Sequence, residues 1–191
     1  AKFQKKSGGL QGLILDLRNN PGGLLDQAVE MGDRFLAKGV IVKTVGRRSQ
    51  EAEEAKPGSP FESIPLIVLV NEGSASASEI VAGSLQQTDR ALVIGNLTFG
   101  KGTVQTIYDL RDGSALKLTV AKYLTAGDRE VQSIGVRPDI ELIPTRVEKD
   151  SVNLFEDEPT NFLEEDRKRI PAPEATFRLR YLTNDPKKSE E

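Results

Sequence analysis

The sequence predicts an α/β fold with a mostly parallel sheet, flanking helices and a β-hairpin. Three short apolar runs, at 12–17, 64–70 and 91–95, have the composition of strands that are buried on both faces. A stretch with helical periodicity separates each run from the next. Because strands that alternate with helices pair in parallel, these segments predict a layer of parallel strands covered by helices.

The remaining elements follow from local patterns. Apolar residues at helical spacing predict a helix over 24–36, and a strand over 40–45 follows it. The charged stretch 47–60, which contains Gly and Pro, is expected to be a loop. A second helix is expected over 79–85.

A β-hairpin is predicted after the third apolar run. Segments 103–110 and 115–124 alternate in polarity, and Asp112-Gly113 lies between them. An Asp-Gly pair favours the tight turns that connect antiparallel strands.

The chain divides into a main domain over 1–145 and an acidic, Pro-containing extension over 146–191. The extension is expected to be loosely ordered or wrapped on a partner, with a last anchored element over 177–182 and a frayed tail over 185–191. The chain starts at Ala1 without an initiator Met or an export signal, so we expect it to be a piece of a longer protein.

Composition excludes several classes of function. A net charge of −3 does not suit a general nucleic-acid binder, and the absence of cysteine and histidine excludes disulfides and the usual zinc sites. The absence of histidine also means that a serine nucleophile here needs a base other than imidazole. Lysine is the obvious choice, since a lysine held among apolar groups loses its proton near neutral pH.

The run 74–79, Ser-Ala-Ser-Ala-Ser-Glu, supports two interpretations. Ser76 and Glu79 have the spacing of a capping box at the start of a helix, which is the commoner meaning of such a pattern in isolation. The same position suits a nucleophile, because free amides at a helix N-terminus stabilise an oxyanion. Ser74 is expected to form a cap or turn, and Ser78 to bond locally in the first helical turn.

Lys101 lies in Gly100-Lys101-Gly102, a pattern that usually forms a solvated turn. Phe99 and Val104 could supply apolar surroundings for its side chain. The segment is not a P-loop, because glycine stands where a hydroxyl residue should follow the lysine.

Segments 15–23, 70–79 and 95–105 together resemble the carboxyl-terminal processing (tail-specific) proteases, the S41 peptidases. The first contains Asn-Asn-Pro-Gly-Gly, the second Asn-Glu-Gly-Ser-Ala-Ser-Ala-Ser-Glu and the third Thr-Phe-Gly-Lys-Gly-Thr-Val-Gln. The resemblance extends over about residues 10 to 143 and includes Gly-Val-Arg-Pro-Asp at 135–139.

The resemblance implies a role for five residues. Ser76 would be the nucleophile, Lys101 the base, and Gln105 the residue that orients the lysine. The amides of Ala77 and of Gly22, which we favour over the following glycine, would form the oxyanion hole.

Other polar residues near these segments are assigned differently. Asp16 and Arg18 are expected to fix the end of a strand by ion pairing. Two roles are considered for Glu79, a helix cap and a support of the site. Some family members have Gln-Asp in the helix after the nucleophile, whereas residues 86–89 here are Gln-Gln-Thr-Asp.

The resemblance further implies a spiral core like that of Clp peptidase and crotonase, with no metal or cofactor. Substrates would be proteins or peptides cut in or near their C-termini, and no nucleic acid is expected as a partner. A PDZ domain is expected in the full-length protein, as is an extracytoplasmic (periplasmic or cell-envelope) bacterial location. The acidic extension could act as a dimerisation arm, in which case the protein would be a homo-oligomer.

Two alternatives stand beside the peptidase interpretation. In one, the chain is a catalytically impaired core fragment that acts as a binding or scaffold module. In the other, it is an esterase or amidase acting on small substrates.

Overall fold

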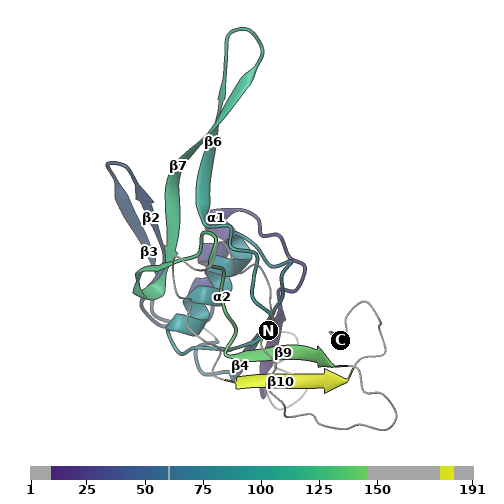
Figure 1. The fold of residues 1–191 in the computed structure, drawn as a ribbon. Coiled ribbons are helices and arrows are strands. Elements are labelled where there is room, and N and C mark those ends of the chain that lie inside the picture. The colour runs from purple at the N-terminus through teal and green to yellow at the C-terminus, as the bar shows by residue number, and fades with distance from the viewer. Residues whose placement is uncertain (1–9, 60, 146–176, 183–191) are drawn as a thin grey trace.

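The protein is seen in a computed structural model that describes residues 10–59, 61–145 and 177–182. Two five-stranded sheets and two α-helices form the described part (Figure 1). This architecture confirms the predicted α/β class with a parallel sheet, flanking helices and a hairpin.

The first sheet is parallel throughout and has the strand order β1-β4-β5-β9-β10. Its strands are β1 (Leu13–Asp16), β4 (Leu66–Val70), β5 (Leu92–Gly95), β9 (Ile140–Thr145) and β10 (Phe177–Leu182). The central strands carry the fully buried Val68, Val70 and Val93. Because the strands are parallel, β1, β4 and β5 end at the same edge of the sheet. The predicted motifs begin at this edge.

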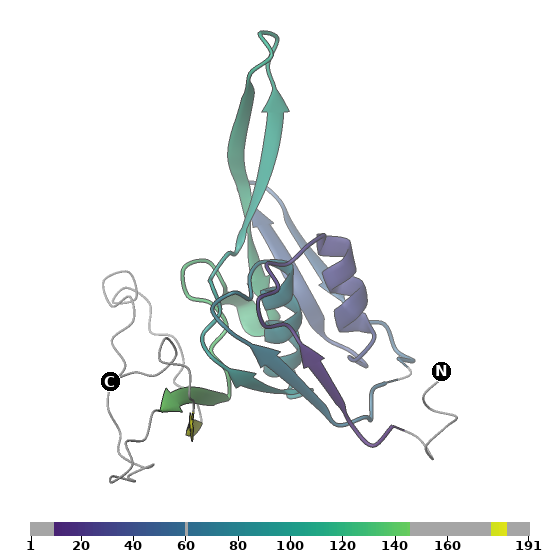
Figure 2. The same cartoon turned by 90° about the vertical axis from the view of Figure 1, so that its right-hand side faces the viewer.

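Helix α2 (Ala77–Gln87) lies between the two sheets, while α1 (Leu25–Asp33) packs beside it (Figure 2). Every residue from Ala77 to Leu85 is buried. A helix that is buried all round belongs to the interior of a domain rather than to its surface. The N-terminus of α2 is consequently held in place by the core.

The second sheet is antiparallel, with the strand order β3-β2-β7-β6 and a short β8 that pairs with β7. Its strands are β2 (Val40–Gly46), β3 (Gln50–Glu54), β6 (Thr103–Asp109), β7 (Ala115–Thr125) and β8 (Arg129–Glu130), and the 3-10 helix η1 (Ala126–Asp128) joins the last two. Strands β6 and β7 form a hairpin that projects from the rest of the molecule (Figures 1 and 2).

Several boundaries differ from the expectations. The expected loop over 47–60 is wrong in part, because Gln50–Glu54 form β3. All five residues of that strand are exposed, so its sequence shows no alternation of apolar and polar residues. Its pairing with β2 is what makes it a strand. Helix α1 is shorter than the predicted 24–36, and β9 was not predicted at all.

The anchored element expected over 177–182 is strand β10, which extends the first sheet by pairing with β9. The acidic part of the extension and the expected tail lie outside the described residues. Neither of the helices that the structure describes is long and apolar enough to cross a bilayer.

Candidate active site

Three loops meet at the N-terminus of α2, and each follows the carboxyl end of a strand of the parallel sheet. They are 17–24 after β1, 71–76 after β4, and 96–102 after β5. Crevices at the carboxyl ends of parallel strands are the usual sites of binding and chemistry in α/β folds. The three motifs predicted from the sequence are therefore brought together.

Ser76 occupies the last position before helix α2 and has a backbone conformation that is rare for a residue with a side chain. Its φ is 57° and its ψ is −117°, and the residue is half-buried. Such conformations cost about 1–3 kcal/mol and persist where the surrounding structure enforces them. Here the Ser76 amide donates to Glu79 Oε2 over 2.8 Å, the carboxylate contact of a capping box.

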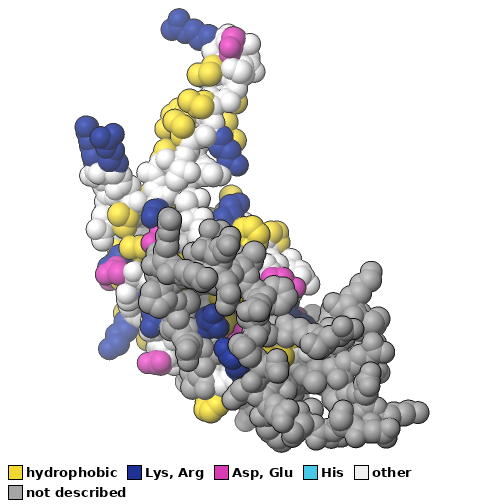
Figure 3. Space-filling model, in the orientation of Figure 1, with side chains coloured by type: hydrophobic (Ala, Val, Ile, Leu, Met, Phe, Trp, Pro, Cys, Tyr) yellow, Lys and Arg dark blue, Asp and Glu magenta, His cyan; other side chains and the backbone are white. Residues whose placement is uncertain are grey.

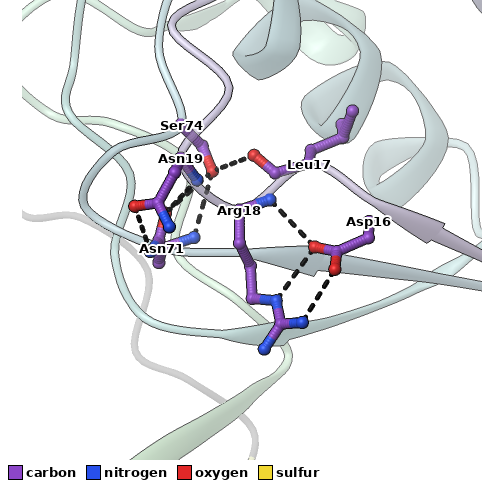
Figure 4. Close-up of polar contacts among 6 residues, drawn as sticks. All are labelled: Asp16, Leu17, Arg18, Asn19, Asn71 and Ser74. Atoms are coloured by element: carbon purple, nitrogen blue, oxygen red, sulfur yellow. Dashed lines mark hydrogen bonds and ion pairs between the residues drawn. The ribbon is translucent and has the colours of Figure 1, made fainter.

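Ser74 has a structural role, as expected from the sequence. Its hydroxyl is fully buried, donates to the Leu17 carbonyl over 2.7 Å and accepts from the Asn71 amide over 3.0 Å (Figure 4). Asn71 in turn exchanges hydrogen bonds with Asn19, at 2.8 Å to its amide and 3.0 Å to its side chain. This network joins the loop after β1 to the loop that carries Ser76.

Gly22 lies directly against the Ser76 segment. Its φ is 94°, and a Cβ atom at this position would lie 2.5 Å from the Ala75 carbonyl oxygen and 2.7 Å from the Ala77 nitrogen. Gly23, by contrast, faces open space, with nothing within 4 Å of such an atom. The Gly22 amide donates to Asn20 Oδ1 over 3.0 Å, and this local hydrogen bond stabilises the turn.

Ala77 is the first residue of α2, a position whose amide has no acceptor inside the helix. The helix macrodipole adds partial positive charge at this end. The nitrogen of Ala77 and the backbone of Gly22 thus lie close together beside Ser76.

Glu79 links the Ser76 turn to the Lys101 loop. Its carboxylate is fully buried and accepts four hydrogen bonds. The amides of Ser76 and Lys101 both donate to Oε2, each over 2.8 Å. The hydroxyl of Thr98 and the amide of Gly100 donate to Oε1, over 2.5 and 2.7 Å. Glu79 is therefore both helix cap and site support, the two roles that the sequence left open.

The backbone around Lys101 is held from its other side as well. The Gly100 carbonyl accepts from the Ser133 amide over 2.9 Å, and the Gly102 amide donates to Gln132 Oε1 over 2.9 Å. A Cβ atom on Gly102 would lie 2.5 Å from the Gln132 nitrogen, so a residue with a side chain does not fit there. The glycines on both sides of Lys101 let the loop pack closely.

No hydrogen bond joins the side chains of Lys101 and Gln105 within the part of the chain that the structure describes. Lys101 and Gln105 are both exposed, and Gln105 donates weakly to Thr119 Oγ1 at 3.5 Å. Phe99, one of the expected apolar neighbours of the lysine, is 69% exposed. The described residues thus fix the Lys101 backbone, while Lys101 as a whole is exposed.

Asp16 and Arg18 form the ion pair expected at the end of β1. Arg18 donates through Nη2 to Asp16 Oδ2 over 2.7 Å and through Nε to Oδ1 over 2.9 Å (Figure 4). Hydrogen bonds from the side chain and amide of Arg18 lower the pKa of Asp16 from 3.8 to about 2. Both side chains remain about half exposed, so the pair shapes the turn without being buried.

Two further contacts were missed from the sequence. Thr98 accepts from the Val136 amide over 2.7 Å while donating to Glu79, and so ties the Lys101 loop to the segment before β9. Gln86 donates to Asp139 Oδ1 over 2.9 Å and to the Arg137 carbonyl over 2.8 Å. Gln86 therefore anchors α2 to the segment before β9.

The fold and this site define a class: an α/β protein that presents a serine on a strained turn between a strand and a helix, as serine hydrolases display their nucleophile. Comparison with known proteins gives the family. The family model described as peptidase family S41 matches residues 1–142, and the chain belongs to that family.

Its relatives include curated processing proteases. The chain is 50% identical over 154 residues to the carboxy-terminal-processing protease of Bartonella bacilliformis, covering 78% of this chain and 36% of that protein. It is 44% identical over 139 residues to the carboxyl-terminal-processing protease of Synechocystis, covering 73% and 33%. The chain thus spans about a third of the length of the curated relatives it matches.

A solved structure shares the fold. The photosystem II D1 C-terminal processing protease superimposes with a TM-score of 0.68 at 41% sequence identity, over 73% of this chain and 36% of that one.

Proposed function

We propose that this chain is the catalytic core of a serine endopeptidase that cleaves proteins in or near their C-termini by a Ser76/Lys101 dyad. The observation that carries the proposal is the carboxylate of Glu79, because its Oε2 accepts from the amides of both Ser76 and Lys101. The backbone nitrogens of these two residues are therefore at most twice 2.8 Å apart. The family and the names of its processing-protease relatives support the choice of reaction and substrate.

In the proposed reaction, Ser76 Oγ attacks the scissile carbonyl carbon while a neutral Lys101 Nζ accepts the hydroxyl proton. The tetrahedral intermediate then breaks its C–N bond, and the proton passes from Lys101 to the leaving amine. Water attacks the resulting ester of Ser76, again with Lys101 as the base, and releases the second product. No metal or cofactor enters these steps.

The oxyanion would be held by the amides of Ala77 and Gly22. The position of Ala77 at the helix N-terminus and the close approach of Gly22 to it support this assignment. The Gly22 amide would share its hydrogen bond between Asn20 Oδ1 and the oxyanion.

Lys101 becomes a base only when water is excluded from its amine. Bound substrate, together with parts of a longer protein, would supply that cover, since Lys101 is exposed in the described residues. Gln105 would then orient the amine, leaving its weak 3.5 Å contact with Thr119.

The setting of the core is part of the same proposal. A PDZ domain elsewhere in a longer protein would present substrate tails, which fits the span of about a third of the relatives' length. An extracytoplasmic bacterial location and a homo-oligomer are proposed from the family resemblance. No nucleic acid is expected as a partner, given the net charge of −3.

Substitutions in the protein that carries this chain test the dyad. Ser76→Ala and Lys101→Ala should each lower kcat/KM for an unfolded protein substrate by about 10³-fold or more, whereas Lys38→Ala on the exposed surface should not. A fluorophosphonate probe should label Ser76, as read by mass spectrometry of the modified peptide. Wild-type activity in Ser76→Ala would overturn the proposal.

One observation favours a second candidate, a binding or scaffold module: the exposure of Lys101, the proposed base. A folded protein that binds unfolded polypeptide, does not cleave it and leaves Ser76 unlabelled would support that role instead.

A further inference from the structure

The two edge strands of the antiparallel sheet differ in how many charged residues they carry. Strand β3 forms one edge and carries Glu51, Glu53 and Glu54, all exposed. Strand β6 forms the other edge, and its residues 103–108 include no charge and no proline. Charged side chains on an edge strand prevent further strands from adding to it. Within the described residues, the only charge on β6 is the exposed Asp109 at its outer end, and a register shift lies between Val104 and Gln105. The β6 edge is therefore less protected than the β3 edge along residues 105–108.

The backbone groups of β6 that face away from β7 can be identified. The Leu110 amide donates to the Ser114 carbonyl over 2.8 Å, and the Gly102 carbonyl accepts from the Tyr123 amide over 2.7 Å. The register shift between Val104 and Gln105 adds its extra residue on β7, so inward and outward residues still alternate along β6. The even-numbered residues of β6 therefore face β7. The amides and carbonyls of Gln105 and Ile107 therefore point to the open edge.

One face of the hairpin is apolar. Tyr108 lies opposite Leu116, and Thr106 lies opposite Leu118. The three large side chains are 44–47% exposed, and Figure 3 shows hydrophobic side chains along the projecting hairpin. A strand added beside β6 would place every second side chain next to this face.

The open edge is continuous with the candidate active site. Strand β6 starts at Thr103, two residues after Lys101, and the backbone between them is pinned through Gly102. At about 3.3 Å per residue, Ile107 lies roughly 20 Å along the chain from Lys101. An extended polypeptide with its scissile bond at Ser76 would need about six further residues to reach it.

We propose that the open edge of β6 is a binding site for an extended polypeptide with apolar side chains at alternate positions, and that its occupant is the substrate chain on one side of the scissile bond. This rests on the proposed function. Backbone hydrogen bonds from Gln105 and Ile107 would hold the added strand, and its alternate side chains would cover Tyr108. The edge thereby selects substrates that are unfolded for several residues beyond the cut.

The geometry favours this occupant over a second copy of the chain. A hairpin face about seven residues long and two strands wide offers roughly 200 Å². A stable dimer buries about 800 Å² per partner, so the face is too small to hold two copies together by itself. The outer part of β7 is a poorer edge, because Lys117 lies within it.

Amide hydrogen exchange tests the site without requiring turnover. The probe is a 14-residue synthetic peptide with valine at alternate positions and serine or lysine between them, added to the Ser76→Ala form of the protein that carries this chain. We expect the amides of Gln105 and Ile107 to exchange at least 10-fold more slowly with peptide, while those of Thr106 and Tyr108 stay unchanged. In Ile107→Pro, which removes an outward donor and spares the pairing with β7, the peptide Kd should rise about 10-fold. Ile107→Thr keeps the donor and should stay within about two-fold of Ser76→Ala alone.

Each other outcome overturns the inference. Peptide that does not bind, or that binds without slowing exchange at Gln105 and Ile107, excludes the edge as the site. Slow exchange without peptide means that the edge is already covered, by a second copy if it depends on protein concentration and by the same polypeptide if it does not. Labelling of Ser76 by a fluorophosphonate in the unsubstituted protein is scored separately, so failure of the catalytic proposal can be told from failure of the edge site.

Discussion

The backbone amides of Ser76 and Lys101 donate to the same oxygen atom, Oε2 of Glu79, each over 2.8 Å. The first amide belongs to the turn before α2 and the second to the loop after β5. A buried carboxylate thus sets the spacing of two segments that are 25 residues apart in the chain, as counted from residue 76 to residue 101. The relative position of the proposed nucleophile and base depends on it.

Glu79→Gln should therefore disrupt both stability and activity. The amide group of glutamine would present hydrogens to at least one of the pairs of donors that now face the carboxylate, leaving buried donors unpaired. We expect a loss of about 3 kcal/mol in the free energy of unfolding, measured in urea, and a fall of about 100-fold or more in kcat/KM. Glu72→Gln on the exposed part of the same loop is the control and should change neither.

Gly22 and Gly23 provide a matched pair of substitutions. Gly22→Ala should destabilise the protein by about 2 kcal/mol or more, since φ is 94° and the new methyl group would collide with Ala75 and Ala77. Gly23→Ala should stay within about 0.5 kcal/mol, because nothing lies within 4 Å of its methyl position. Thermal unfolding of both variants measures the contrast, and equal effects would contradict the packing described for the turn.

Ser74→Ala should mainly lower stability and Ser76→Ala should mainly lower activity, although the two serines lie in the same run. Ser74→Ala removes a buried hydroxyl that bonds to Leu17 and Asn71, so we expect a loss of about 1–3 kcal/mol in unfolding free energy. Ser76→Ala should leave stability within about 1 kcal/mol while abolishing cleavage. Ser49→Ala, at an exposed turn, controls for the loss of a hydroxyl. A Ser74→Ala protein as stable as this control would rule out the structural role of Ser74.

The Asp16–Arg18 pair predicts a specific dependence of stability on pH. The folded pKa of Asp16 is about 2 and its ordinary value is 3.8, so the pair contributes stability above pH 3.8 and loses it as the pH falls toward 2. The difference in unfolding free energy between wild type and Asp16→Asn should be constant above that range and shrink within it. An NMR titration should place the Asp16 pKa near 2 in wild type and higher in Arg18→Gln. A wild-type value near 3.8 would show that the pair does not form in solution.

Much of the fold could be predicted because its elements carry local signals. The apolar runs that became β1, β4 and β5 are short and bounded by turns, and Asp112-Gly113 marks the hairpin turn. Burial on both faces was expected for these runs and is wrong for β1, whose residues alternate between half-buried and exposed, with Ile14 62% exposed. Strand β3 carried no such signal, since all five of its residues face solvent and only pairing with β2 makes it a strand. Expectations about the acidic extension fall on residues outside the described part.

The site was predicted as motifs, and the structure adds how they are joined. Nothing local to Thr98 indicates that its hydroxyl would bond to a carboxylate 19 positions earlier, because that contact exists only once α2 and the loop after β5 are packed. The surroundings of Lys101 could not be read from its flanking residues either. Phe99 precedes it by two positions and yet turns outward.

The backbone of Ser76, with φ at 57° and ψ at −117°, makes position 76 one where the proposed chemistry and folding favour different residues. Only glycine adopts such angles without penalty, and glycine has no hydroxyl. A descendant of this chain released from its chemistry would be expected to acquire glycine there and to become harder to unfold as a result. If the proposed chemistry is correct, relatives that cleave peptides should carry serine rather than glycine at this place.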